Sequence, residues 1–202
     1  PMIFDEPHHI FHRASNFADF DIHEMSFGRY ISLVSQKKNE MTALPVFPSR
    51  VARQSAFYVR TDSKIKTPSD LEGMRIGIPE WTQTATIYAR GWLAETVGVD
   101  LRTIKWFQTG VDEPGRPEPS NPILPEGIEV TPVANQSLSD MILGGDIDCV
   151  LTALPPKSIR EGDRRVKRLI ANATKVEEEY YQETGIFPIM HLICVKNEIL
   201  EK

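Results

Sequence analysis

A histidine and a glutamate stand side by side near the start of the chain, within the stretch FDIHEMS. His23 and Glu24 follow three residues that alternate like a short strand, and a helical pattern begins directly after them. Strand-to-helix corners of this kind carry ligand chemistry in open α/β sheets. A histidine or glutamate whose pKa lies near neutrality can donate a proton to a reacting group. The stretch therefore predicts either a proton-transfer site or a polar corner at which His23 caps the helix.

Two arginines lie three residues apart in the stretch VFPSRVARQS, on an expected loop between two strands. Arg50 and Arg53 could each bind a carboxylate through the bidentate fork of a guanidinium group. Ser49 offers a further hydrogen bond beside them. The two arginines share one face only if this loop makes a helical turn. The alternative is that they pair with acidic residues on the surface.

The stretch PEWTQTAT predicts an anion site in the middle of the chain. Thr82, Gln83 and Thr84 stand at an expected helix N-terminus, where unpaired backbone N–H groups and the helix dipole attract anions. Glu80 lies close by and could act as a base. A plain threonine cap explains the same pattern, and capping does not exclude ligand binding. Arg90, farther along this helix, is interpreted as structural.

Three later residues are weaker candidates. Arg116 ends the turn DEPGR, which either folds over a site as a lid or is an ordinary proline-rich loop. Phe187, in TGIFPIMH, could stack on an aromatic ring. His191 begins the last strand and is either a second proton donor or a structural histidine.

The composition is that of a globular protein and disfavours several classes of function. The chain has 202 residues, 41% of them hydrophobic and 25% charged, and its formal net charge of −5 disfavours a nucleic-acid surface. No apolar run approaches the roughly 20 residues of a membrane span, and no signal peptide is visible. Cys149 and Cys194 occupy apolar runs and are expected to be buried thiols. His8 and His12 have metal-pair spacing, but no further ligand is placed, so no metal is predicted.

The periodicity along the chain alternates between strands and helices, which predicts an α/β fold with a parallel or mixed sheet. Gly28 to Ser35 reads as a helix with Tyr30, Ile31 and Val34 facing inward. A strand at 75–78, a helix from Thr84 and a strand at 104–107 form a β-α-β unit with a parallel pair. The other expected strands and helices are strands at 41–46, 55–60, 128–133, 147–151, 169–171 and 191–196, and helices at 137–143 and 175–184. Residues 110–125 are too rich in proline to be anything but a long loop.

Several stretches together resemble the 4,5-dihydroxyphthalate decarboxylase family, an offshoot of the two-lobed, type II periplasmic-binding-protein fold. They are FDIHEMSFGRYISL, LPVFPSRVARQSAFYVR, DLEGMRIGIPEWTQTATIYARGWL, GVDEPGR, LSDMILGGDIDCVLTALPP and EEEYYQETGIFPIMHLICVKNEILEK. The resemblance implies mixed sheets flanked by helices and a first lobe that is incomplete, because family members continue at both ends. It divides the chain into part of lobe 1 with a crossover strand (1–60), lobe 2 (61–190), and a second crossover strand returning to lobe 1 (191–202).

The resemblance also implies an activity, namely decarboxylation of 4,5-dihydroxyphthalate, or a related hydroxylated aromatic acid, to protocatechuate. The ring carbon that loses carbon dioxide must be protonated, and no cofactor is required. His23 is expected to be the acid and Glu24 its orienting partner, with His191 as the second choice. The ligand is expected in a cleft between the lobes. The residues expected to bind it are Ser26, Ser49, Arg50, Arg53, Glu80, Thr82, Gln83, Thr84, Arg116 and Phe187.

One alternative of a different class stays open. The same fold serves non-catalytic ABC-type solute-binding proteins, which here would bind a small organic acid or amine. An enzyme is expected in the cytoplasm, and a transport receptor in the periplasm. The sequence leaves the oligomeric state open.

Overall fold

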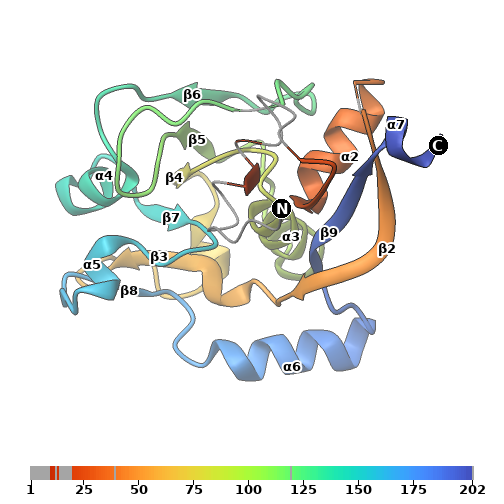
Figure 1. The fold of residues 1–202 in the computed structure, drawn as a ribbon. Helices are drawn as coiled ribbons and strands as arrows, with labels where there is room; N and C mark the ends of the chain where they lie inside the picture. Colours follow the sequence, from red (N-terminus) through yellow and green to blue (C-terminus); the bar gives the residue numbers. More distant parts are fainter. Residues whose placement is uncertain (1–9, 12, 14–19, 39, 119, 202) are drawn as a thin grey trace. The chain divides into compact units, whose positions relative to one another are not determined.

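The computed structural model describes residues 10–11, 13, 20–38, 40–118 and 120–201 (Figure 1). The chain forms two compact units: unit 1 comprises residues 1–51 and 187–202, and unit 2 comprises residues 52–186. Unit 1 is therefore built from both ends of the chain, whereas unit 2 is continuous. How these units correspond to the expected lobes stays a prediction.

Unit 1 is a three-stranded antiparallel sheet in the order β1-β9-β2, with helix α2 against it. The last strand along the chain is thus the central one. Side chains alternate between the two faces of each strand. Met25, Leu192 and Cys194 form a small buried core on the face covered by α2. Its helices and strands are β1 (Ile22–Ser26), α2 (Phe27–Ser35), β2 (Met41–Arg50), β9 (Ile189–Lys196) and α7 (Asn197–Leu200).

Two expectations for unit 1 are wrong in detail. In α2, Tyr30 packs against the core as expected, but Ile31 and Val34 are 51% and 41% exposed. The inward face is instead formed by Phe27, Tyr30 and Leu33. These residues are three positions apart, which is slightly less than one helical turn. The strand expected at 41–46 continues to Arg50, past two prolines, because a bulge between Leu44 and Ser49 absorbs the residues that cannot donate to the ladder.

Unit 2 is a six-stranded mixed sheet in the order β6-β5-β4-β7-β3-β8. The pairs among β4, β5, β6 and β7 are parallel, and β3 runs antiparallel to its two neighbours. The expected β-α-β unit is therefore confirmed. Its strands are β3 (Phe57–Arg60), β4 (Arg75–Ile78), β5 (Lys105–Gln108), β6 (Val130–Pro132), β7 (Cys149–Leu151) and β8 (Val166–Arg168).

Helices cover both faces of this sheet, and each face has its own core. The larger core packs Ile76, Ile78 and Trp106 against α3, its π-helical extension and α6. The smaller core packs Tyr58 and Val150 against α4 and α5. The helices are α3 (Thr84–Trp92), the extension η3 (Leu93–Val97), α4 (Leu138–Gly144), α5 (Lys157–Arg160) and α6 (Ala173–Thr184), with two short 3₁₀ turns, η1 (Gln54–Ala56) and η2 (Pro68–Leu71).

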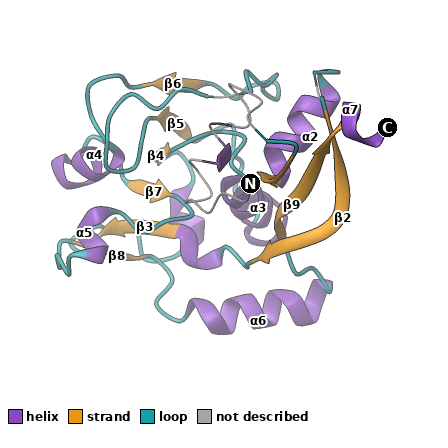
Figure 2. Cartoon of the chain, in the orientation of Figure 1, coloured by secondary structure: helices purple, strands orange, loops and turns teal. Residues whose placement is uncertain are grey.

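Helix ends in unit 2 follow the sequence closely, whereas one strand is displaced. Ser137 caps α4 through a capping box, and Gly145 and Gly185 end α4 and α6 with positive φ. The strand expected at 169–171 is found at 166–168. The described residues of the stretch 110–125, which are 110–118 and 120–125, form the expected long loop, drawn in teal between β5 and β6 in Figure 2.

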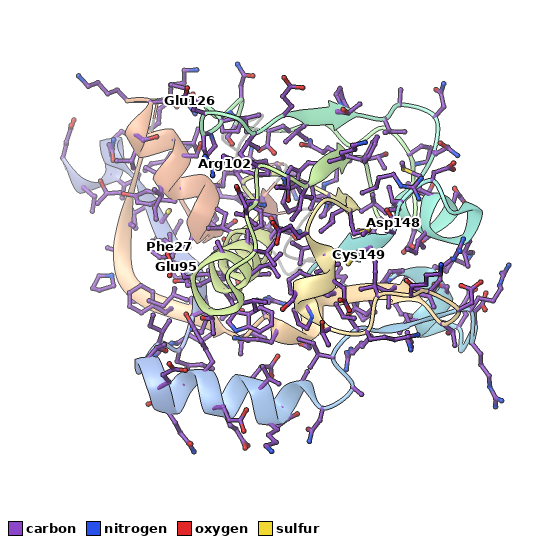
Figure 3. The ribbon with its side chains drawn as sticks, turned by 180° about the vertical axis from the view of Figure 1, so that it is seen from behind. Phe27, Glu95, Arg102, Glu126, Asp148 and Cys149 are labelled. Carbon is purple, nitrogen blue, oxygen red and sulfur yellow. The ribbon has the colours of Figure 1, made fainter. Side chains whose placement is uncertain are left out.

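Both cysteines are buried and free, as expected. Figure 3 labels Cys149 beside Asp148 at the start of β7. Asp148 accepts two hydrogen bonds from the guanidinium group of Arg75, at 2.7 and 2.9 Å, which ties β7 to β4. Burial raises the pKa of the Cys194 thiol to about 12, so it stays protonated. Within the described residues, no helix is long and apolar enough to cross a membrane.

Candidate functional site

A histidine–carboxylate pair lies on the face of the unit 1 sheet opposite α2. The Nδ1 atom of His191 lies 2.6 Å from Oε1 of Glu24, and both side chains are about a quarter exposed (21% and 26%). Because a carboxylate only accepts, His191 donates through Nδ1–H. This contact fixes the tautomer that carries a proton on Nδ1. The pair has the form of an oriented general acid–base.

The strand register explains why these two residues meet. Glu24 lies opposite Ile193 on β9, and Ser26 lies opposite His191, so Glu24 and His191 are diagonal neighbours on one face. On the other side of β9, Ser49 of β2 also lies opposite His191. Ser26, His191 and Ser49 therefore form a polar row across the three strands.

An aromatic ring bounds the histidine of this row. The ring of Phe11 meets the imidazole of His191 edge to face, with the ring centroids 4.9 Å apart. Such contacts orient the ring and partly remove it from water. The imidazole is thus held by a carboxylate at one edge and by an apolar ring.

The expected partnership of His23 with the Glu24 carboxylate is not made. Successive strand residues point to opposite faces, so His23 lies on the α2 side, where only 7% of it is exposed. Its Nδ1 atom lies 2.8 Å from the main-chain oxygen of Glu24. Burial lowers the pKa of His23, which keeps its ring neutral. A buried neutral imidazole is a poor proton donor, so of the two expected histidines His191 is the better placed candidate for the acid.

Arg50 and Phe187, both expected to bind substrate, lie together in unit 1. Arg50 donates from Nη2 to the main-chain oxygen of Phe187 at 2.8 Å, and its guanidinium carbon lies 4.9 Å from the centre of the Phe187 ring. The ring is 45% exposed. Arg53 belongs instead to unit 2, where it precedes η1, and residues 51–53 form no helical turn. The condition for a shared arginine face is therefore not met.

The turn just before α3 holds a carboxylate of the protein itself, bound by N–H groups of two residues that precede the N-cap rather than by the first N–H groups of the helix. Oε2 of Glu118 accepts from the backbone N–H groups of Trp81 (2.5 Å) and Thr82 (3.3 Å). Oε1 accepts from the hydroxyl groups of Thr82 and Ser120. Sequence reasoning missed Glu118, although an acidic residue in a long loop after a strand was a visible signal. The geometry demonstrates that this corner can bind a carboxylate without any lysine.

The cap of α3 differs from the expectation. Gln83 occupies the N-cap position and makes no side-chain capping bond, whereas Thr82 precedes the helix and Thr84 lies in its first turn. Thr82 and Thr84 are 5% and 3% exposed. Glu80 and Arg116, expected to act on a ligand, form an ion pair with each other, with Nε of Arg116 2.7 Å from Oε1 of Glu80.

Arg90 lies buried beside this anion site. It is 5% exposed, donates from Nη2 to the main-chain oxygen of Trp81 at 2.8 Å, and stacks 3.7 Å from the centre of the Trp81 ring. Burial lowers the pKa of Arg90 to about 9, and the charge of Glu118 opposes this shift. Its Nη1 atom has no hydrogen-bond partner among the described residues. The expected structural role fits, and the residue also supplies positive charge beside the anion site.

Residues able to hold a metal do not gather in the part of the chain that the structure describes: no group of three or more His, Cys, Asp or Glu side chains has the required arrangement there. His8 and His12 lie outside the described residues.

Comparison with known proteins identifies the family. The chain is 36% identical over 202 residues to a 4,5-dihydroxyphthalate decarboxylase of Comamonas testosteroni, covering 100% of this chain and 61% of that one. It is 32% identical over 182 residues to a 4,5-dihydroxyphthalate decarboxylase of Pseudomonas putida, covering 90% of this chain and 70% of that one. The chain belongs to the 4,5-dihydroxyphthalate decarboxylase family. No family model matches it.

Solved structures confirm the fold that goes with this family. The periplasmic aliphatic sulphonate binding protein SsuA of Escherichia coli superposes with a TM-score of 0.56 at 13% identity, covering 96% of this chain and 53% of that one. SsuA of Xanthomonas axonopodis pv. citri, an alkanesulfonate-binding protein bound to MOPS, gives 0.56 at 14% identity with the same coverage. This member of the 4,5-dihydroxyphthalate decarboxylase family thus has the α/β fold of type II periplasmic-binding proteins.

Proposed function

We propose that the protein decarboxylates 4,5-dihydroxyphthalate, or a closely related hydroxylated aromatic diacid, to the corresponding monoacid. Two relatives that bear this name support the substrate, although the chain spans 61% and 70% of their lengths. The observation that carries the proposal is the 2.6 Å contact between His191 and Glu24. It provides the oriented proton donor that such a reaction requires.

Decarboxylation requires that one proton be delivered to the ring carbon that loses its carboxylate. The imidazolium of His191 donates from Nε2 to the ring carbon that bears the departing carboxylate, and a hydroxyl group para to that carbon supplies electron density. The bond to the carboxylate then breaks, its electron pair restores the aromatic ring, and carbon dioxide leaves. Glu24 holds Nδ1–H throughout and stabilises the imidazolium by its charge. Water returns the proton to His191 after each turnover.

Each unit by itself contains groups that suit an aromatic acid. The start of α3 in unit 2 receives a carboxylate, which is supported by the four donors that hold Glu118 there. Phe187 and Arg50 in unit 1 offer an exposed ring and a guanidinium group to an aromatic anion. The cleft expected between the lobes stays a prediction.

A non-catalytic solute-binding function is the second candidate, because the fold is shared with sulfonate-binding proteins. The names of the two relatives favour the enzyme. We further propose a cytoplasmic location, with which two free, buried thiols are compatible.

Carbon dioxide release from purified protein and 4,5-dihydroxyphthalate tests the proposal. We expect His191→Gln and Glu24→Gln to lower kcat, the first by about 10²–10⁴-fold, the usual contribution of a general acid. Substrate binding, measured by calorimetry, should change little. Glu40→Gln, an exposed carboxylate beside β2, is the control for Glu24 and should keep full turnover.

His23→Gln distinguishes the two histidines, because it should retain turnover in protein that is still folded. Full activity of His191→Gln, or its loss only in His23→Gln, would contradict the assignment of the acid. No carbon dioxide from any of a panel of hydroxylated aromatic acids would end the decarboxylase proposal.

A further inference from the structure

The carboxylate of Glu118 occupies the anion site at the start of α3 in the manner of a ligand. Both of its oxygens are used: one accepts the N–H groups of Trp81 and Thr82, and the other accepts the Thr82 and Ser120 hydroxyl groups. Thr82 and Ser120 are each 5% exposed. A substrate carboxylate bound at this corner would need the same N–H and hydroxyl donors, so the two cannot be held together.

The loop that carries Glu118 is held against unit 2 at other points as well. Asp112, near its start, accepts from the hydroxyl of Ser139 (2.6 Å) and from the backbone N–H of Lys157 (2.8 Å). Farther along, Arg116 pairs with Glu80. Because the loop is tethered at these places, Glu118 stays at high effective concentration near the α3 site.

Two residues beside this corner each carry a buried polar atom that makes no hydrogen bond to Glu118. Neither Nη1 of Arg90, a donor, nor Oε1 of Gln83, an acceptor, has a hydrogen-bond partner among the described residues. Buried polar atoms without partners are unfavourable. The charge of Glu118 acts on Arg90, so a carboxylate that replaces Glu118 takes over this interaction as well.

We propose that Glu118 is a built-in competitor for the carboxylate site at the start of α3, and that an aromatic diacid must displace it to bind. The inference rests on the proposed function, since it concerns the same carboxylate site. In the unliganded protein, Glu118 then keeps weakly binding anions out of this carboxylate site. The diacid displaces Glu118 by presenting its own carboxylate to the same four donors.

Competition of this kind raises the apparent dissociation constant of the ligand. If Glu118 is docked in nine-tenths of the molecules, about one-tenth are competent, and the apparent Kd is raised about tenfold. Glu118→Gln weakens docking by removing the charge, and Glu118→Ala removes docking altogether. Glu118→Ala should therefore bind phthalate and 4,5-dihydroxyphthalate about tenfold tighter than the parent protein, and Glu118→Gln should fall between the two.

Titration calorimetry at fixed ionic strength measures these affinities. Glu113→Gln is the matched control, because Glu113 is an exposed carboxylate of the same loop and its loss changes the net charge equally. Its affinity should equal that of the parent. The inference is supported if both Glu118 variants bind more tightly than the parent protein and Glu113→Gln does not.

The other outcomes separate the two proposals. Equal or weaker binding by both Glu118 variants would overturn the competitor and leave decarboxylation standing. Tighter binding without carbon dioxide release would contradict decarboxylation alone. No binding of either diacid to any variant would overturn both.

Discussion

A single buried imidazole makes the stability of this protein depend on pH. Only 7% of His23 is exposed, and burial is the main cause of its lowered pKa, to which the nearby charge of Arg29 adds. The hydrogen bond with the Glu24 carbonyl acts in the other direction. The unfolded chain, with a histidine pKa of about 6.5, therefore binds a proton more readily than the folded state does.

We predict that the free energy of unfolding falls as the pH is lowered from about 7.5 to 5.5, because protons then favour the unfolded state. The contribution of His23 is complete above its unfolded pKa and is lost progressively below it. In His23→Gln this part of the pH dependence should disappear, whatever the change in stability at pH 7.5. Urea unfolding at the two pH values measures the effect, and an unchanged pH dependence would contradict it.

For individual residues of the candidate site, only part of the arrangement could be predicted from the sequence. The alternation of strand side chains already places His23 and Glu24 on opposite faces, so their separation follows from their adjacency. The pairing of Glu24 with His191, 167 residues away, depends on the register between β1 and β9. Nothing in a single sequence fixes that register. Glu118 was missed for a similar reason, because the path of a long loop is not encoded locally.

At the scale of secondary-structure elements, one glycine decides how closely a helix approaches the unit 2 sheet. A Cβ atom at Gly77 in β4 would lie 2.5 Å from Leu138 Cδ2 and 2.7 Å from Ile147 Cδ1. Both distances are well inside van der Waals contact. Leu138, the first residue of α4, is fully buried. The absence of a side chain at Gly77 therefore allows α4 to pack on β4.

We predict that Gly77→Ala destabilises the protein by about 1–3 kcal/mol through overpacking. Gly91→Ala, in the helix α3, is the matched control, since its Cβ would have no atom within 4 Å. There the better helix propensity of alanine should stabilise by roughly 0.5–1 kcal/mol. Chemical denaturation compares the two, and the same sign for both changes would refute this packing argument.

Element boundaries could be predicted where a residue type has one strong local preference. The helix expected at 137–143 is observed with Ser137 as its N-cap and Gly145 after its end, and the helix expected at 175–184 ends at Thr184, before Gly185. The sequence places residues 47–50 in a loop, but pairing with β9 and a bulge keep this segment in the sheet. Tertiary contacts outweighed the local preference at that point.

At the scale of the whole molecule, the two units differ in how much core each contains. Unit 2 is one continuous segment with a core on each side of its sheet. Unit 1 joins segments from both ends of the chain, and the hydrophobic cluster among its described residues is built on Met25, Leu192 and Cys194. A small core supplies little stability by itself. The α/β class followed from the periodicity of the chain, whereas this division depends on long-range pairing.

We predict that a fragment of residues 52–186 folds independently and unfolds cooperatively. Scanning calorimetry of the whole protein should show two transitions, of which the lower belongs to unit 1 and is absent from the fragment. The upper transition should match that of the fragment. A fragment without a cooperative transition would show that unit 2 depends on unit 1.

The central position of β9 has a consequence for synthesis on the ribosome. β1 and β2 do not pair with each other, and both must wait for the strand between them, which is made after all of unit 2. At translation rates of about 5–20 residues per second, that delay is on the order of ten seconds. During that time the nascent chain exposes two unpaired strands, which are targets for chaperones and for mispairing with neighbouring chains.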